Sequence, residues 1–385
     1  WSCRPLSGFC FDPQVVGDSR TRANDSYALQ KLAPAWVVRR LLPVLTIVTR
    51  LGHCFSPAEV LLNCHSVLFG WHKLAHDFKF FRIYQMHPGT LRKKLSGVIA
   101  FPVTPFKEDL SLDLPGLHEN LTKLLEHPIA AVVTAGGTGE LYSLTPAEYA
   151  RVVELTTHAV EDRVPVIAGV GFGQRLAVEM AQAAEKAGAD GILAFPPYYP
   201  QAEDEGLFEY YRAIGKATRL GMLIYTRDWA SFTPAMVERL TAIPTLVGWK
   251  DGHGDIRRLQ MIINHVGDRL HWIGGAGDDI MAAYFSIGVT TFSSSIATVA
   301  PGLPLKLWEL ADAGESEMLK DLLDRCVVPL YALRARRKGY EVSVMKAMMD
   351  MIGMSGGPVR PPLVSIKPDE EDEVRAILAS WEKFL

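Results

Sequence analysis

Short apolar runs alternate with amphipathic stretches along most of the chain, from about residue 95 onward. Each run has the length of a strand, is rich in Val, Ile and Ala, and is bounded by Gly or Pro. Such runs are typical of strands that are buried on both faces of a parallel sheet. The pattern predicts strands at residues 97–103, 130–135, 164–170, 191–195, 222–225, 246–250, 271–275 and 290–294.

The stretches between these runs carry helix signals. Thr145, Pro146 and Glu148 supply an N-cap, a proline at the first helical position and the acid of a capping box. Gly188 suits the position just after a helix end. Helices are therefore predicted at residues 145–160, 176–187, 208–218, 234–241, 256–266 and 279–286.

Eight strands that alternate with helices predict an α/β fold, a (β/α)8 TIM barrel within residues 86–314. Residues 315–385 are predicted to form a C-terminal helical extension, whose last helix spans 369–384 and begins with acidic residues. The alternative fold is an open, doubly wound sheet. Its dinucleotide-binding version is disfavoured, because no Gly-x-Gly-x-x-Gly follows the first strand.

The composition is that of a globular protein, with 48% apolar residues, 22% charged residues and a formal net charge of −3. This charge gives no reason to expect a nucleic-acid partner. No apolar run approaches the roughly 18 residues of a membrane span, so no membrane association is expected. Cys326 is alone in residues 86–385, which favours a reducing compartment, and we expect a cytoplasmic protein.

Residues 1–85 differ from the rest of the chain. They carry a net charge of +5, against −8 for residues 86–385, and Met86 is the first methionine. We therefore expect a segment outside the working protein, disordered or read from a mis-set start. The alternatives are a genuine extension and a zinc site, although no Cys-x-x-Cys pair supports a zinc site. Its ligands would come from the nearby histidines and from Cys3, Cys10, Cys54 and Cys64.

Candidate catalytic residues stand at the carboxyl ends of the predicted strands, where the active sites of TIM barrels lie. Lys250 ends a buried strand, and burial favours the neutral amine that forms imines with ketones. The alternatives are a lysine that reaches the surface or one that pairs with Asp251. Tyr225 ends the preceding strand, where its phenol could move protons, although a core tyrosine is the commoner case.

A glycine-rich turn, Gly136-Gly137-Thr138-Gly139-Glu140, follows the second predicted strand. Its backbone N–H groups and the Thr138 hydroxyl suit a carboxylate or a phosphate. The turn is not a P-loop, since no Lys-Ser or Lys-Thr follows. Glycines also form tight turns that bind nothing, so the turn alone is a weak signal.

Together these residues resemble the dihydrodipicolinate synthase/N-acetylneuraminate lyase family of class I Schiff-base lyases. The resemblance covers about residues 92–385, and within the family it favours the 5-dehydro-4-deoxyglucarate dehydratase branch. The motifs that carry it are the glycine-rich turn, Pro197-Tyr198-Tyr199-Pro200, Tyr225-Thr226-Arg227-Asp228, Lys250-Asp251-Gly252-His253-Gly254-Asp255, Gly277-Asp278-Asp279 and the tail Gly357-Pro358-Val359-Arg360-Pro361-Pro362.

The resemblance implies a decarboxylating dehydratase that uses no metal and no organic cofactor. Lys250 would form an imine with a dicarboxylic 2-oxo sugar acid, and Tyr225 would shuttle protons. Gly137 and Thr138 would hold the 2-oxo acid carboxylate. Arg227 would hold the distal carboxylate, unless it is a surface arginine. The products would be 2,5-dioxopentanoate, CO2 and water, and a homo-oligomer is expected, because family members commonly form dimers or tetramers.

Some residues depart from the family pattern. Gly137 stands where family synthases have a relay threonine, and Trp229 and Ser294-Ser295 differ from the dehydratase pattern. Ser294, at the end of the last strand, remains a candidate substrate-binding residue. An aldolase that releases pyruvate is an alternative function, and so is a non-catalytic barrel that binds carboxylates.

Overall fold

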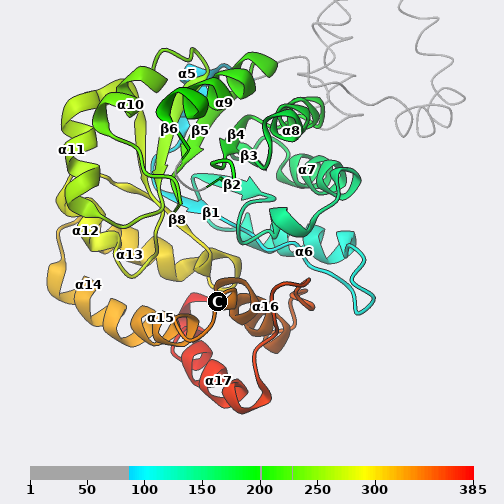
Figure 1. Ribbon diagram of the computed structural model, residues 1–385. Coiled ribbons are helices and arrows are strands. Elements are labelled where there is room, and N and C mark those ends of the chain that lie inside the picture. Colours follow the sequence, from blue (N-terminus) through cyan, green and yellow to red (C-terminus); the bar gives the residue numbers. More distant parts are fainter. Residues whose placement is uncertain (1–85, 200–201, 228) are drawn as a thin grey trace, which may run out of the picture. The chain divides into compact units, whose positions relative to one another are not determined.

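The computed structural model describes residues 86–199, 202–227 and 229–385. Within them, eight parallel strands close into a barrel in which each strand pairs with the next and the last pairs with the first (Figure 1). The predicted TIM barrel is confirmed, and the open sheet is excluded. The strands are β1 (Val98–Ala100), β2 (Ala131–Thr134), β3 (Val166–Val170), β4 (Gly191–Ala194), β5 (Gly221–Tyr225), β6 (Leu246–Asp251), β7 (His271–Gly274) and β8 (Thr291–Ser294). The expectations for residues 1–85, including the zinc site, lie outside this description.

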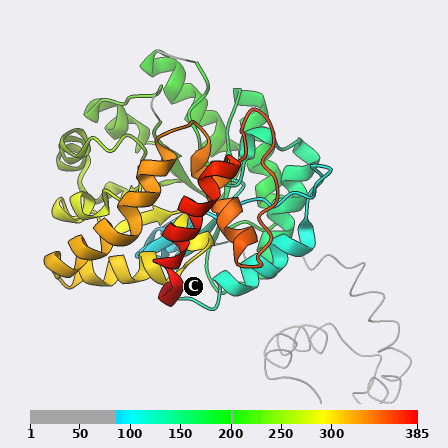
Figure 2. The ribbon, with the colours of Figure 1, turned by 90° about the horizontal axis from the view of Figure 1, so that it is seen from below.

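Helices follow the strands around the outside of the barrel, and further helices gather beside it at the C-terminal end of the chain (Figures 1 and 2). The helices of the barrel are α6 (Leu114–Leu124), α7 (Pro146–Val160), α8 (Gln174–Lys186), α9 (Asp204–Ala217), α10 (Pro234–Leu240), α11 (Ile256–Val266), α12 (Met281–Ser286) and α13 (Gly302–Asp312). The C-terminal extension contains α14 (Ser316–Leu322), α15 (Val328–Arg334), α16 (Tyr340–Met351) and α17 (Glu371–Ala379). None of the helices in the described part of the chain is long and apolar enough to cross a membrane.

The local helix signals act as the sequence predicts. The Thr145 side chain accepts from the Glu148 N–H while the Glu148 carboxylate accepts from the Thr145 N–H, which completes the capping box of α7. Gly188 has a φ of 87°, in the left-handed region that a residue just beyond a helix end requires. These signals are local, and tertiary contacts do not override them.

Several bounds differ from the predicted ones. Strand β1 stops at Ala100, because Pro102 has no N–H with which to extend a ladder. The last helix, expected at 369–384, is divided, and α17 ends at Ala379. The apolar pattern did not predict three helices that the structure contains: α5 (Pro88–Lys94), α6 and α13.

Helix α5 closes the amino-terminal end of the barrel. Leu91 and Leu95 are fully buried and belong to the cluster that fills the barrel interior. A Cβ atom on Gly221, at the start of β5, would lie 2.8 Å from the Leu91 side chain, so a glycine is needed there. In the described part of the chain, α5 thus fills the amino-terminal end of the barrel interior.

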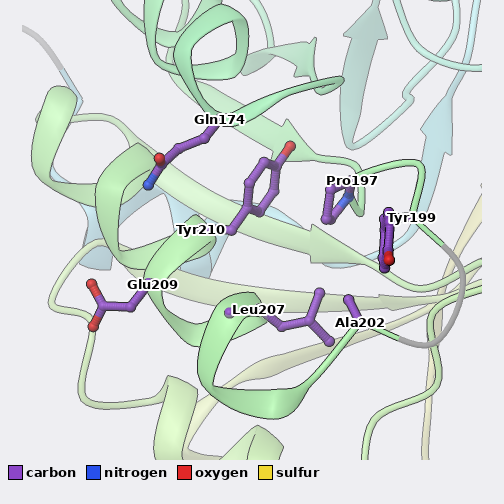
Figure 3. Close-up of a pocket in the computed structure, with 8 residues that line it drawn as sticks. Gln174, Pro197, Tyr199, Ala202, Leu207, Glu209 and Tyr210 are labelled. Atoms are coloured by element: carbon purple, nitrogen blue, oxygen red, sulfur yellow. The ribbon is translucent and has the colours of Figure 1, made fainter.

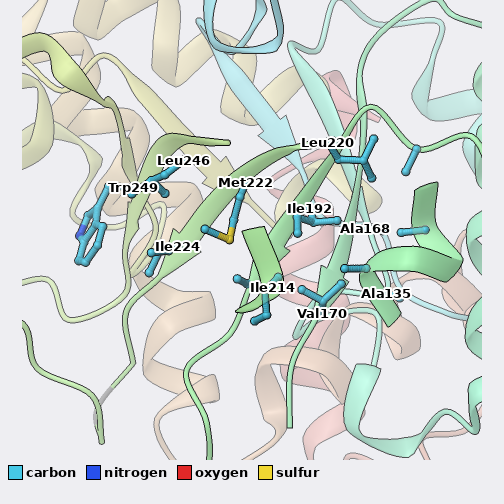
Figure 4. Close-up of a cluster of buried hydrophobic side chains, with 14 of the residues drawn as sticks. Ala135, Ala168, Val170, Ile192, Ile214, Leu220, Met222, Ile224, Leu246 and Trp249 are labelled. Atoms are coloured by element: carbon cyan, nitrogen blue, oxygen red, sulfur yellow. The ribbon is translucent and has the colours of Figure 1, made fainter. Parts of the chain in front are cut away.

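A second apolar layer joins the strands to the surrounding helices. Outward side chains of β3, β4 and β5, among them Ala168, Ile192 and Ile224, pack with Ile214 of α9 (Figure 4). These residues are buried completely, as expected for a sheet that is covered on both faces. The rigid strands therefore hold the residues at their carboxyl ends in fixed positions.

The C-terminal helices form their own apolar cluster against α13 and β8. Val344, Met348 and Trp381 are fully buried there, and the Trp381 indole donates to the Cys326 carbonyl, at 2.7 Å. The segment Leu323–Val327 is a π-helical turn that leads into α15. Pro329 explains this turn, because a proline removes an N–H from the helical ladder. The extension thus brings α15 and α16 next to the carboxyl end of the barrel.

Candidate active site

Lys250 lies at the carboxyl end of β6 and is only 3% exposed. Its Nζ donates to the Gly275 carbonyl, at 2.9 Å. Burial lowers the pKa of the Lys250 ammonium, with the Tyr225 phenol acting in the opposite direction. A Cβ atom at position 275 would collide with Nζ, so Gly275 leaves the space that the amine occupies. The amine is therefore buried and partly shifted toward its nucleophilic form.

The alternative in which Lys250 pairs with Asp251 is not what the structure contains. The Asp251 carboxylate accepts from the Tyr284 hydroxyl, at 2.7 Å, and from the N–H groups of His253 and Gly254. These bonds direct the carboxylate toward α12 and the loop after β6. Asp251 therefore organises this loop, and Lys250 keeps its amine for other chemistry.

Tyr225 is the neighbour of Lys250 in the barrel, and the two residues are in register on β5 and β6. Nζ of Lys250 lies 3.7 Å from the centroid of the Tyr225 ring and 5.2 Å from that of Phe101. Burial alone raises the pKa of the Tyr225 phenol, but the charges of Lys250 and Arg227 outweigh it, and the net pKa is lowered. A phenol with a lowered pKa beside a lysine with a lowered pKa is suited to proton transfer between them.

Arg227 contacts Tyr225 directly, a link that the sequence did not predict. Its Nη1 donates to the Tyr225 hydroxyl, at 3.1 Å, and its guanidinium lies 5.5 Å from the centroid of the Trp229 ring. Trp229 in turn donates to the Pro197 carbonyl, at 3.2 Å, and makes an edge contact with Tyr198. The tyrosine loop therefore contacts Arg227 through Trp229, and Arg227 is partly buried, not a free surface arginine.

The glycine-rich turn stands at the carboxyl end of β2. A Cβ atom on Gly137 would meet no atom within 4 Å, so this residue faces open space, and Thr138 is also partly exposed. The turn is fixed where Thr104 donates to the Gly139 carbonyl, at 2.7 Å. Phe101 lies close to both the turn and Lys250. Its ring would lie 3.0 Å from a Cβ atom on Gly136, and its ring centroid lies 5.2 Å from Lys250 Nζ. The turn is thus open on one side and anchored on the other.

Ser294 lies at the end of β8 and is fully buried. Its Oγ accepts from the Ala297 N–H, at 3.2 Å, and the hydroxyl is directed to the Asp278 carboxylate. Asp278 also accepts from the Tyr331 hydroxyl of α15, at 3.1 Å. Ser294 therefore belongs to a buried polar wall, and no sequence pattern indicated that α15 supplies part of it.

Asp278 is 1% exposed, and burial raises its pKa to about 6 in spite of the hydrogen bonds from Ser294 and Tyr331. Because the folded pKa exceeds that of an unfolded aspartate, this group contributes stability that is fully present below pH 4 and is lost as the pH rises through 6. We expect Asp278→Asn to remove this loss, which amounts to roughly 3 kcal/mol. The measurement is the Tm of both proteins from pH 4 to 8. The advantage of the variant should grow from pH 4 to about pH 6 and then level off, and a constant difference from pH 4 to 8 would contradict the prediction.

Comparison with known proteins agrees with this geometry. The chain matches the model of the Dihydrodipicolinate synthetase family over residues 94–381. Its structure is similar to the crystal structure of dihydrodipicolinate synthase from Oceanobacillus iheyensis, with a TM-score of 0.73. The two sequences are 30% identical, and the match covers 77% of this chain and 99% of that one.

This chain belongs to the dihydrodipicolinate synthetase family.

Relatives within this family carry a more specific name. The chain is 40% identical over 286 residues to a protein from Bradyrhizobium diazoefficiens named probable 5-dehydro-4-deoxyglucarate dehydratase, covering 74% of this chain and 91% of that one. It is 42% identical over 293 residues to a protein of the same name from Saccharopolyspora erythraea, covering 75% and 94%. The family and branch predicted from the motifs are therefore confirmed.

A second lysine, Lys346, is also buried. Lys346 of α16 is 1% exposed, and its Nζ lies 2.6 Å from Oε1 of Glu140. Burial lowers the pKa of Lys346, but the Glu140 carboxylate favours the charged form. A cation held by a carboxylate is a poor nucleophile, so of the two lysines Lys250 is the one suited to imine formation.

A hollow of about 320 Å³ lies apart from Lys250, between the loop after β4 and α9 (Figure 3). Pro197, Tyr199 and Tyr210 line it, and none of the predicted catalytic or substrate-binding residues does. The side chain of Tyr210 is held in the wall of this hollow, because its hydroxyl donates to the carbonyls of Phe172 and Phe195. In the described part of the chain, no group of His, Cys, Asp and Glu residues is arranged to hold a metal ion.

Proposed function

We propose that this protein is a decarboxylating dehydratase that converts 5-dehydro-4-deoxy-D-glucarate to 2,5-dioxopentanoate, CO2 and water through an imine on Lys250. The observation that carries the proposal is the buried amine of Lys250 on the Tyr225 ring, with Arg227 bonded to that phenol. It stands in a chain 40–42% identical to relatives named probable 5-dehydro-4-deoxyglucarate dehydratase.

The reaction begins when neutral Lys250 attacks the substrate ketone and water leaves, which forms a protonated imine. The imine withdraws electrons and acidifies the adjacent carbon, and Tyr225 accepts the proton from it. The resulting enamine expels the β-hydroxyl, which leaves as water after it takes up a proton. The product of this step is a conjugated imine.

The conjugated imine then accepts the electron pair of the bond to the distal carboxylate, which leaves as CO2. Protonation of the resulting dienamine and hydrolysis of the imine release 2,5-dioxopentanoate and regenerate the amine. One CO2 and one water leave for each substrate, because the water lost in forming the imine is taken up in its hydrolysis. Lysine supplies the electron sink, so these steps need no organic cofactor.

The two substrate carboxylates need separate partners. The open face of Gly137 and the hydroxyl of Thr138 suit the carboxylate next to the ketone, since backbone N–H groups in a turn bind anions. Arg227 suits the distal carboxylate, because its planar guanidinium matches that group. Arg227 also lowers the pKa of Tyr225, so it couples the distal end of the substrate to the proton-transfer group. Ser294 contributes through the buried wall that it forms with Asp278.

Product analysis separates this function from its two alternatives. Incubation with 5-dehydro-4-deoxyglucarate should release CO2 and 2,5-dioxopentanoate in equal amounts. Release of pyruvate instead would identify an aldolase, in which the enamine arises by carbon–carbon cleavage. Absence of any adduct after borohydride reduction would identify a non-catalytic barrel that binds carboxylates.

We also propose that the protein is a homo-oligomer with the tyrosine loop near the subunit contact. Tyr198 and Tyr199 support this, because they are 82% and 69% exposed, and aromatic side chains are enriched at protein interfaces. Sedimentation of the full chain tests it, and a monomer at assay concentration contradicts it.

The division of the chain into a dispensable segment 1–85, a barrel within 86–314 and helices within 315–385 is likewise our proposal. A chain that begins at Met86 retains every residue assigned a chemical role, so it should fold and turn over substrate like the full chain. Activity assays of both chains, with limited proteolysis of the longer one, measure this. An insoluble or inactive shorter chain would show that the first segment is needed.

A further inference from the structure

We propose that the C-terminal segment from Lys346 to Arg360 is a positioning device that holds the glycine-rich turn 136–140 in the conformation that binds the substrate's 2-oxo acid carboxylate. This inference rests on the proposed function, which assigns that carboxylate to the turn. It gives a role to the tail motif 357–362, which the catalytic steps do not use. Residues of the segment and the turn that meet are far apart in sequence, for example by 220 positions for Arg360 and Glu140.

Glu140 is the residue of the turn that the C-terminal segment contacts. It is the last residue of the turn, is fully buried, and has the left-handed conformation, with a φ of 53°. A non-glycine residue in this conformation persists when its surroundings fix it. Lys346 Nζ lies 2.6 Å from one oxygen of its carboxylate, and the Arg360 N–H donates to the other, at 3.0 Å. The C-terminal segment thus occupies both oxygens.

The contact with Lys346 also neutralises the negative charge of the Glu140 carboxylate. An ionised Glu140 without a partner would repel a substrate carboxylate bound by the same turn, and repulsion is strong in a buried environment. The ammonium of Lys346 neutralises it at contact distance. Lys346 is itself held from the tail, since its Nζ donates to the Pro358 carbonyl, at 2.9 Å. Affinity of the turn for an anion therefore depends on residues that never touch the anion.

The Arg360 side chain secures the chain on the far side of Glu140. Its guanidinium donates to the Leu110 carbonyl, to the Ser143 carbonyl at 2.8 Å, and to both oxygens of Glu148. Ser143 follows the turn directly, and Glu148 is the capping-box acid of α7. The hydrogen bonds of Arg360 lower the pKa of Glu148 to about 2, so this pair stays charged at neutral pH. One side chain thus joins the exit of the turn to the start of the next helix.

The tail is shaped for this contact. Phe106 contacts both cations, with its ring centroid 4.3 Å from Lys346 Nζ and 4.1 Å from the Arg360 guanidinium carbon. Gly356 and Gly357 pass so close to the carbonyls of Lys346 and Phe106 that a Cβ atom at either position would collide with them. Glycines are therefore needed at these two positions for the tail to pass close to Lys346 and Phe106.

The role is one of positioning, because in residues 86–199, 202–227 and 229–385 no hydrogen bond or ion pair joins Lys250 to Lys346, Arg360 or Glu140. Loosening the turn should weaken binding of a carboxylate and leave the amine itself reactive. Two small ketones separate these effects. Pyruvate carries the carboxylate that the turn binds, whereas hydroxyacetone lacks it and tests only imine formation at Lys250.

The test measures how much of each ketone gives half-maximal borohydride trapping on Lys250 in the full chain and in Arg360→Met. For pyruvate, the required concentration should rise on the order of 10- to 100-fold, as small misplacements of binding groups do. For hydroxyacetone it should stay the same. Arg336→Met is the matched control, since Arg336 makes a two-bond pair with Glu373 on the exposed surface of the extension, and it should change neither value.

An unchanged requirement for pyruvate, or an equal rise for both ketones, overturns the proposal. If Arg360→Met does not fold, Arg360→Lys and Glu148→Gln replace it, because each keeps part of the contact and should give a smaller rise for pyruvate alone. A structural role without positioning would lower Tm in these variants and leave the ratio between the ketones unchanged.

Hydrogen exchange tests the positioning role without any chemistry, so that its failure is distinguishable from failure of the proposed function. The N–H groups of Glu140, Leu141 and Ser143 bond to carbonyls within the turn and its exit. They should exchange faster in Arg360→Met and not in Arg336→Met. If the unaltered chain traps neither ketone, the imine mechanism is wrong, and equal exchange in both variants would then reject the positioning role as well.

Discussion

Replacement of Lys250 by Met should abolish trapping of the substrate by borohydride and lower turnover by roughly a million-fold, the order of loss seen when an enzyme loses its covalent nucleophile. The thioether fills a similar volume, so the barrel should remain folded. No other group of the described site offers a neutral amine to the ketone. The loss should therefore appear in kcat and not as a change in KM alone.

The position of the label decides this prediction. Reduction with borohydride in the presence of substrate should add the mass of the reduced ligand to the peptide that contains Lys250. The peptide with Lys346 is an internal control, because that lysine is equally buried but is held 2.6 Å from Glu140. A label on Lys346, or an undiminished rate in Lys250→Met, would contradict the proposed mechanism.

The parts of this structure that the sequence predicted are those that local chemistry determines. Apolar runs identified all eight strands, since a buried parallel strand requires them whatever surrounds it. The capping box of α7 needed only Thr145 and Glu148, three positions apart. Lys250 and Tyr225 could be paired because consecutive strands of a barrel are neighbours, and their carboxyl ends lie at one face.

The parts that the sequence did not predict depend on distant contacts or on weak patterns. Helix α6 has Pro115 and Gly116 in its first turn, which is typical of a loop, and its Asp113 cap is recognised only once the helix is known. The bond between Tyr331 and Asp278 joins residues 53 positions apart, and that between Arg360 and Glu148 joins residues 212 positions apart. No periodicity indicates such pairs, so Arg360 could be noticed as part of a motif, but its partners could not.

Replacement of Tyr225 by Phe should lower kcat by about 100- to 10,000-fold, the usual worth of a general acid–base group. The ring remains, so its contact with Lys250 Nζ and its edge contact with Phe195 are kept. Only the hydroxyl is lost, together with its bond from Arg227. Imine formation should therefore still occur, slowly, and borohydride should still label Lys250.

The matched control is Tyr210→Phe, which removes another buried hydroxyl, one that donates to the carbonyls of Phe172 and Phe195. It should change Tm and leave kcat near that of the unaltered protein. A rate for Tyr225→Phe close to that of the control would mean that another group moves the proton.

A pH profile connects the phenol to its neighbour. Because the charge of Arg227 helps to lower the pKa of Tyr225, Arg227→Gln should raise that pKa. If Tyr225 must lose its proton to act as the base, the limb of the kcat/KM profile that depends on it should move to higher pH in Arg227→Gln and be absent in Tyr225→Phe. If the limb of the pH profile stays at the same pH in Arg227→Gln, Arg227 acts in substrate binding alone. If the limb moves and the KM for the dicarboxylate also rises, Arg227 both binds the substrate and lowers the pKa of Tyr225.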